Sequence, residues 1–173
     1  MTMATLLAPI HIISYATLLG TSLFQTFVNT KVCYTELPKS AFTTLQKRLF
    51  PIYFRCQSAL LILTALTFPP AGPASLFKNK GDWILFAIAA VTAMTNLFIY
   101  GPRTKRAMIE RIHQETRDAK RPDAVDEVSP DMQACRRQFS VSHAMSIHLN
   151  IVTIVTMLWY GVRLGSRLSG DIA

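Results

Sequence analysis

The chain has 173 residues, of which half are hydrophobic and only 16 % are charged. An average soluble domain has about 25 % charged residues, so the composition argues against an ordinary cytosolic protein. The formal net charge is +8, yet no charged residue occurs before Lys31, whereas a nucleic-acid-binding module interleaves Lys and Arg with its folded elements. We therefore expect a membrane protein with basic loops, and no nucleic acid as a partner.

Four segments are long and apolar enough to cross a bilayer, whose core of about 30 Å needs about 20 helical residues. The predicted spans are residues 6–28, 50–67, 83–100 and 139–162. The first is too long for a signal peptide and lacks a basic start and a small-residue cleavage site, so we expect it to be retained. The predicted fold is all-α, a single domain over residues 1–173 that forms an antiparallel, up-down four-helix bundle in the lipid bilayer.

The connections between the spans carry their own signals. Pro38 ends the first helix, and residues 41–49 are predicted to form a short amphipathic helix on the membrane surface before Pro51 opens the second span. The proline-rich segment 68–73 indicates a turn. After the third span, residues 103–118 are predicted to form a helix and residues 121–130 an acidic loop.

The distribution of Lys and Arg predicts the orientation, because cytosolic loops are enriched in these residues. The connections at 29–49 and 101–138 hold four and nine of them, against two in the middle loop and two in the tail. We therefore expect both connections in the cytosol, where they can contact anionic lipid. Both termini are then lumenal or extracellular, in an endomembrane or the plasma membrane. Aromatic anchors are expected at the outer interface (Trp83, Trp159, Tyr160) and at the cytosolic one (Tyr34, Tyr53, Tyr100).

The first and fourth spans each carry a polar stripe, since their polar residues recur at steps of three, four or seven. The stripes are His11, Ser14, Thr21, Gln25 and Asn29 in the first span, and His143, Ser146, Asn150 and Thr153 in the fourth. Both should face the bundle interior. Two interpretations stay open: hydrogen bonds between helices, or a polar cavity for a small molecule.

Polar groups from all four spans are expected at one depth, in the cytosolic half of the bundle. The predicted ligand-binding residues are Gln25, Asn29, Arg55, Asn96, His143, Ser146 and Asn150. Arg55 lies inside the second span and either reaches the interface or pairs with a ligand anion. His143 is the candidate catalytic residue, as a general base, and a structural hydrogen bond is the alternative.

Several cofactor classes lack their usual residues. No Asp or Glu falls within the predicted spans, with Asp82 placed at the outer surface, which disfavours carboxylate-bridged di-iron centres and proton-coupled carriers. His11 and His143 are expected at opposite ends of the bundle, too far apart to share a haem iron. Neither a metal nor another cofactor is predicted. The three cysteines have no zinc-binding spacing.

One run of residues resembles a known family. Residues 37–54, which read Leu-Pro-Lys-Ser-Ala-Phe at the start and Phe-Pro-Ile-Tyr-Phe at the end, look like the signature of the transmembrane protein 205 family, together with Pro102-Arg103-Thr104 and the segment from Arg137 to Asn150. The chain looks like a fungal-type member. The resemblance implies a four-span helical bundle in eukaryotic membranes, with a domain of unknown function.

Three hypotheses of function follow. The first is a membrane protein that binds or moves a small amphipathic, lipophilic molecule in its polar pocket. The second is a small membrane-embedded oxygenase or isomerase, since size and helix count are similar to those of fungal anthrone oxygenases; His143 would be its base, and Arg55 or Gln25 would polarise the substrate oxygen. The third is a membrane scaffold whose basic helix 103–118 binds a partner.

Overall fold

The computed structural model describes residues 3–120 and 128–170, and nearly all of them are helical. The helices in chain order are α1 (Met3–Leu23), α2 (Thr30–Glu36), α3 (Lys39–Leu66), α4 (Pro73–Lys78), α5 (Lys80–Thr95), α6 (Gly101–Asp118) and α7 (Pro130–Gly170). Two π-helical segments, η1 (Phe24–Asn29) and η2 (Asn96–Tyr100), join α1 to α2 and α5 to α6 without a break. The predicted all-α fold is confirmed.

Four continuous helical stretches are long and apolar enough to cross a membrane. They are Leu6–Glu36, Lys39–Leu66, Lys80–Asp118 and Pro130–Arg167. Each predicted span lies inside one of them to within a residue, but every stretch is longer than the span it contains. About 20 residues suffice to cross the bilayer core, and each of these helices is longer than that.

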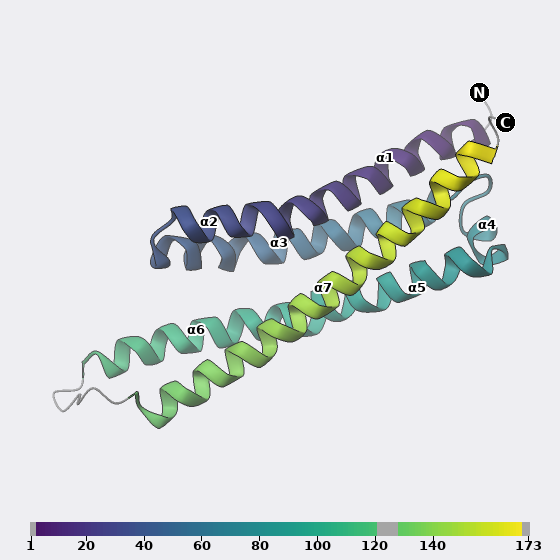
Figure 1. Cartoon of the computed structure of the whole chain (residues 1–173). Helices are drawn as coiled ribbons and strands as arrows, with labels where there is room; N and C mark the ends of the chain where they lie inside the picture. Colours follow the sequence, from purple (N-terminus) through teal and green to yellow (C-terminus); the bar gives the residue numbers. More distant parts are fainter. Residues whose placement is uncertain (1–2, 121–127, 171–173) are drawn as a thin grey trace.

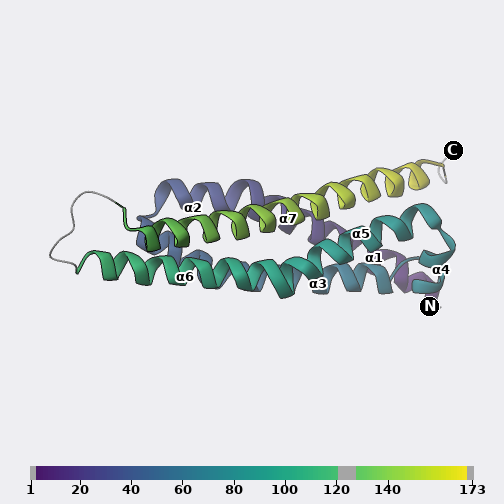
Figure 2. The ribbon, with the colours of Figure 1, turned by 90° about the horizontal axis from the view of Figure 1, so that it is seen from below.

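The bundle consists of two helical hairpins that are close at one end and diverge at the other (Figure 1). The α1–α2 helix packs along α3, and α7 packs along α5 and α6. Helix α7 is inclined, so that its start lies beside α6 and its end approaches α1. A second view shows the start of α7 alongside α6 (Figure 2). The first and last described residues lie at the same end, as an even number of spans requires.

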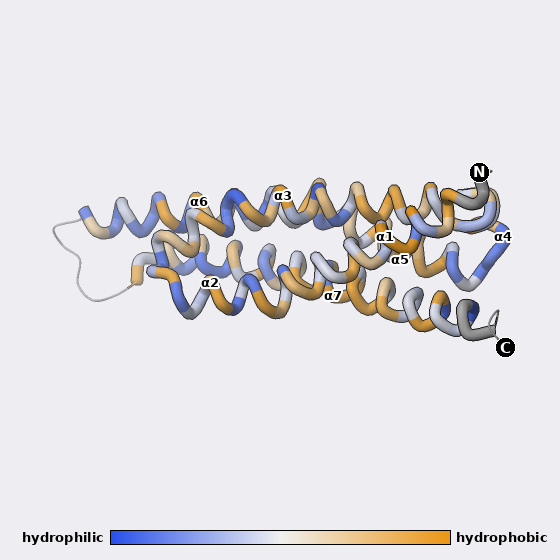
Figure 3. Tube along the Cα trace, turned by 90° about the horizontal axis from the view of Figure 1, so that it is seen from above, coloured by the Kyte–Doolittle hydropathy of each residue, from blue (hydrophilic) through white to orange (hydrophobic). Residues whose placement is uncertain are grey.

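We call the end that holds the chain termini and α4 the terminal half, and the end that holds α2 and α6 the basic half. Hydrophilic residues are frequent along α6 and α2, whereas α5 and much of α1 are hydrophobic (Figure 3). The terminal half contains the main apolar core, which includes Leu18, Leu61, Phe86 and Met157. Ala89 and Ala93 of α5 lie in this core with at most 1 % of their surface exposed, and such small residues four apart let helix backbones approach closely.

The region 41–49 does not form a separate surface helix, which corrects the prediction. Helix α3 runs without a break from Lys39 to Leu66 with Pro51 inside it. Proline removes only one backbone hydrogen bond, and packing against neighbouring helices can compensate for that loss. Helix α6 likewise follows η2 directly, with Pro102 in its first turn; the bond that this proline cannot donate is lost next to the π-helical segment η2.

Two predicted aromatic anchors and one stripe residue are placed differently from expectation. Tyr53 is 7 % exposed and Tyr160 is fully buried, so neither contacts the membrane interface. Thr21 is exposed, and its hydroxyl donates to the carbonyl of Thr17 on the same helix; Ser22 is buried instead. The predicted loop 121–130 lies mostly outside the described residues; Val128 and Ser129 are non-helical, and α7 starts at Pro130.

Asp82 lies in the terminal half, opposite the basic half, and its side chain is completely buried. It lies in the first turn of α5, where a carboxylate is favoured by the helix dipole. Its two oxygens accept from Arg163 Nε, at 2.6 Å, and from Arg167 Nη2. The predicted fourth span ended before both arginines, but α7 continues past them and brings them to Asp82. This ion cluster fastens α5 to α7 in the terminal half.

Candidate functional site

A cavity of about 460 Å³ lies in the basic half, between the two hairpins. Its walls come from α3, from η2 and α6, and from α7. Two threonines, Thr26 of η1 and Thr30 of α2, complete the lining. Its volume falls within the range of about 300–1,000 Å³ that is usual for small-molecule sites. The cavity is therefore large enough to hold a small organic molecule.

Helical spacing explains how each helix presents one face to the cavity. Helix α3 contributes residues 46, 47, 50, 51, 54 and 55, η2 and α6 contribute 97, 98, 101, 102, 104, 105 and 108, and α7 contributes 143, 146, 147 and 150. Most of the wall is apolar, with Phe50 and Phe54 facing Leu97, Phe98 and Met108. Phe98 is 70 % exposed and also lines the cavity, so the cavity wall includes an apolar side chain on the molecular surface, within a predicted span.

Two side chains in the lining have buried polar atoms without a hydrogen-bond partner. Gln46 is 2 % exposed, and neither its amide nitrogen nor its amide oxygen is bonded. The hydroxyl of Thr104 is likewise buried and unbonded. An unsatisfied buried donor or acceptor costs about 1–3 kcal/mol, so a ligand that reached these atoms through a rotation of the two side chains would recover part of that free energy.

The structure brings four of the seven predicted ligand-binding residues to the cavity. They are Arg55, His143, Ser146 and Asn150. Arg55 is an exposed residue that also contributes to the lining. Gln25, Asn29 and Asn96 are outside the lining.

The three predicted residues outside the lining bond within or between helices. Asn29 Nδ2 donates to Gln25 Oε1 at 2.8 Å, both on the first helix. Asn96 Nδ2 donates to the carbonyl of Ser146 at 2.8 Å, and the Ser146 hydroxyl donates back to Asn96 Oδ1 at 2.7 Å. This reciprocal pair fastens η2 to α7, so Asn96 makes the kind of interhelical hydrogen bond that the sequence left open.

Asn150 belongs to a polar network that crosses the bundle beside the cavity. Its side-chain oxygen accepts from Tyr53 Oη at 2.8 Å and from Gln57 Nε2 at 3.0 Å, and its amide donates to Thr26 Oγ1 at 2.9 Å. The network joins η1, α3 and α7. The hydroxyl of the neighbouring Ser58 is buried without a partner. These bonds fix the deeper end of the cavity.

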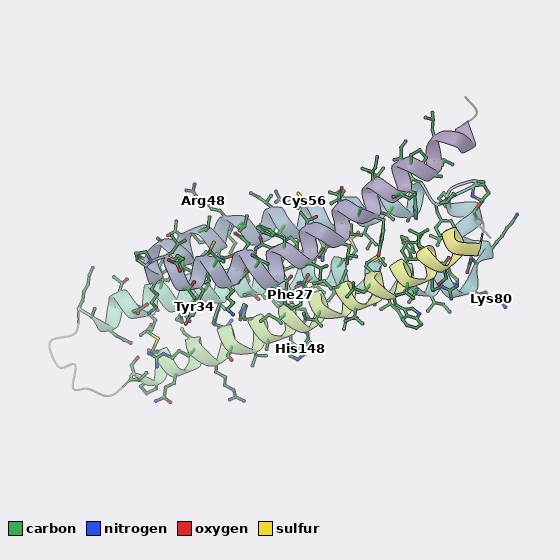
Figure 4. The ribbon with its side chains drawn as sticks, turned by 45° about the horizontal axis from the view of Figure 1, so that its top comes forward. Phe27, Tyr34, Arg48, Cys56, Lys80 and His148 are labelled. Atoms are coloured by element: carbon green, nitrogen blue, oxygen red, sulfur yellow. The ribbon has the colours of Figure 1, made fainter. Side chains whose placement is uncertain are left out.

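His143 is half-buried in the wall formed by α7. Its ring stacks on Phe139, with centroids 5.2 Å apart and an interplanar angle of 11°, and the guanidinium of Arg111 lies 4.6 Å from the centroid of the Phe139 ring on α7. Among the residues that the structure describes, none hydrogen-bonds the ring nitrogens of His143. The imidazole is thus held in place while its nitrogens stay available to a bound molecule. His148, by contrast, projects away from the other helices (Figure 4).

His11 is in the terminal half, and both of its ring nitrogens are bonded. Nδ1 lies 2.8 Å from the carbonyl of Thr64, and Nε2 lies 2.5 Å from the hydroxyl of Tyr160. A carbonyl only accepts, so Nδ1 carries the proton and Nε2 accepts from Tyr160. His11 therefore presents no free nitrogen. Within residues 3–120 and 128–170, no three His, Cys, Asp or Glu side chains are placed to hold a metal ion.

Sequence reasoning missed Gln46, Lys47, Thr104 and Lys105 as lining residues. The periodicity at positions 46, 50 and 54 was a usable signal, because these positions share one face of an uninterrupted helix. The assumption that Pro51 starts a new helix hid this face. The two π-helical segments were also missed; such segments are frequent at functional sites, and both are next to the cavity.

Fold and site together define a multi-pass helical membrane-type protein with a cavity between two hairpins. Residues 13–113 match the family described as a domain of unknown function (DUF4149). The chain belongs to this family, because the match spans more than half of its length. No solved structure matches the chain significantly.

A curated relative covers almost the whole chain. The protein is 43 % identical over 162 residues to xanthocillin biosynthesis cluster protein D of the fungus Aspergillus fumigatus. The aligned region covers 94 % of this chain and 91 % of that protein. The similarity therefore includes all the helices that surround the cavity.

Proposed function

We propose that this protein is a membrane component of small-molecule biosynthesis that binds a small amphipathic molecule in the cavity of its basic half. The observation that carries the proposal is the combination of an apolar wall with the unbonded polar atoms of Gln46 and Thr104. The relative is named for a biosynthesis cluster, which supports a role in such a pathway.

The position of the cavity favours a ligand that partitions into the bilayer. Phe98 is exposed at the level of a predicted span and also lines the cavity, so a lipophilic molecule could enter sideways from the membrane. We further propose that the basic half faces the cytosol, following the excess of Lys and Arg in its connections. The resemblance to the transmembrane protein 205 family and the contact of basic loops with anionic lipid stay predictions.

The test is equilibrium dialysis of radiolabelled dodecanol and dodecanoate against the protein in phosphatidylcholine nanodiscs, with empty nanodiscs subtracted. We expect saturable binding of at least one probe. Leu97→Trp should abolish it by filling the cavity, and Ile147→Trp provides the same test from α7. Val91→Trp, on an exposed position of α5 outside the lining, should bind normally. The absence of saturable binding, or unchanged binding in both filled variants, would refute the proposal.

A second candidate function is catalysis, which the unbonded ring nitrogens of His143 favour. A histidine held by stacking beside a cavity is suited to act as a general base on a bound phenol or polyketide. The test is oxygen consumption with an anthrone as substrate. His143→Gln should abolish turnover while retaining binding, and His148→Gln, at an exposed position on the same helix, should be fully active. No turnover by the wild-type protein with anthrone, or equal rates in both variants, would count against this function.

A further inference from the structure

The charges around the cavity have a single sign. Three cationic residues line it, Lys47 and Arg55 on α3 and Lys105 on α6, and no Asp or Glu is part of the lining. In the described part of the chain, none of the three forms an ion pair; the ion pairs there involve Lys39, Arg163 and Arg167. Cations without partners at a partly apolar cavity favour a ligand that brings negative charge.

Contacts between α3 and α6 fix the location of two of these cations. Lys39 and Glu115 form an exposed ion pair at the ends of the two helices that lie farthest from the terminal half. Closer to the middle of the bundle, the backbone at Gly101 approaches the ring of Phe54. Lys47 and Lys105 lie between these two points on the antiparallel helices, next to Gln46 and Thr104 in sequence. Two of the three cationic residues, together with the unbonded polar groups of Gln46 and Thr104, therefore lie at the end of the cavity farthest from the terminal half.

The deeper part of the cavity combines apolar side chains with Arg55 and with Asn150, whose side chain is already hydrogen-bonded. Phe54, Leu97 and Phe98 line it, one or two helical turns inward from the two lysines. The two lysines thus lie at the end of the cavity farthest from the terminal half, and aromatic and aliphatic side chains line the part further in. This arrangement matches a molecule with one acidic group and one hydrophobic body. The volume of about 460 Å³ is towards the lower end of the usual range, which favours a small molecule over a two-chain lipid.

We infer that the ligand of this cavity is a small hydrophobic acid, whose anionic group lies between Lys47 and Lys105 with hydrogen bonds from Gln46 and Thr104, and whose apolar body contacts Phe54 and Leu97. This inference rests on the proposed function and specifies its ligand class. Lys, amide and hydroxyl donors are all suited to a carboxylate or phosphate oxygen.

The test compares three probes of equal chain length, dodecanoate, dodecanol and dodecylamine, at alkaline pH in phosphatidylcholine nanodiscs. We expect dodecanoate to bind about tenfold more tightly than dodecanol, equivalent to about 1.4 kcal/mol, and dodecylamine to bind most weakly. Equal binding of acid and alcohol would overturn the inference while leaving the proposed function intact. Absence of binding by all three would refute both.

A charge-matched pair of variants isolates the two lysines. Lys47→Gln/Lys105→Gln should weaken dodecanoate binding about tenfold and leave dodecanol binding unchanged. The control, Arg48→Gln/Arg106→Gln, removes the same charge from the adjacent positions, which are exposed and outside the lining; Arg48 points away from the other helices (Figure 4). Equal losses in both double variants would mean that only general surface charge acts, which contradicts the inference.

A final arm distinguishes a small acid from a lipid head group, which has the same anionic chemistry. Nanodiscs containing phosphatidylglycerol are compared with those of phosphatidylcholine alone. We expect the affinity for dodecanoate to change less than in the double lysine variant. If phosphatidylglycerol instead displaces dodecanoate, the site is a lipid-head-group site and the assignment of a small acid is wrong. The comparison of probes on the wild-type protein remains decisive even if the lysine variant does not fold.

Discussion

The buried ion cluster at Asp82 provides a quantitative test of how the terminal half is held together. Asp82→Asn keeps the shape of the side chain but removes the charge that both Arg163 and Arg167 contact. Breaking a fully buried ion pair by removing one partner costs about 3–5 kcal/mol. The two arginine side chains are 36 % and 37 % exposed, so water can solvate them once the partner is lost. We therefore expect a loss of about 2–3 kcal/mol.

The assay is reversible unfolding in mixed micelles of dodecyl maltoside and SDS, followed by tryptophan fluorescence and circular dichroism. Trp83 lies next to Asp82 in sequence and reports on this end. Lys39→Gln is the matched control, because it breaks the Lys39–Glu115 pair, whose side chains are 74 % and 53 % exposed; exposed pairs contribute at most about 1 kcal/mol. If Asp82→Asn were no more destabilising than Lys39→Gln, the assigned role of the ion cluster would be wrong.

Three further predictions use the same unfolding assay. Tyr160→Phe leaves Nε2 of His11 without its donor and should cost about 1 kcal/mol, within the range measured for hydrogen bonds in membrane proteins; unchanged stability would show that this bond contributes nothing. Gly101→Ala should destabilise by about 1 kcal/mol, because the added methyl group meets a backbone oxygen at 2.7 Å and the ring of Phe54 at 3.2 Å. Gly20→Ala, with no atom within 4 Å, should be neutral or stabilising, and equal effects at the two glycines would contradict the close approach. Gln46→Leu should raise stability by about 1 kcal/mol by removing unbonded polar atoms while weakening dodecanoate binding; a loss of stability would mean that the amide is bonded in the protein.

Gln46 illustrates a conflict between stability and binding that the sequence did not reveal. A glutamine near the end of an amphipathic segment is ordinarily solvated. Here the segment is part of α3, and packing against α6 leaves the amide buried and unbonded. Natural proteins retain such unsatisfied groups mainly where a function needs them. We therefore regard Gln46 as the residue that best links the fold to the proposed ligand.

Interhelical partners also depended on the tertiary structure. The spacing of His143, Ser146 and Asn150 placed them on one face of a helix, but it did not show which residue on another helix each contacts. Tyr53 was taken for an interfacial anchor, yet it donates to Asn150. The reason is that helical periodicity defines a face relative to its own axis, whereas pairing depends on the rotation and inclination of the neighbouring helix. The inclination of α7 brings its start to α6 and its end to α1.

The sequence by itself determined the fold class and the number of helices able to span a membrane, because the length and apolar character of a span are local properties set by the thickness of the bilayer. It also located the basic half, since the positions of Lys and Arg are read directly from the sequence. Only the tertiary structure decided that Asp82 is buried with two arginines and which of the predicted ligand-binding residues line the cavity. It also separated Gln25 and Asn96 from that cavity. These outcomes depend on uninterrupted helices, two π-helical segments and the divergence of two hairpins, which no single segment encodes.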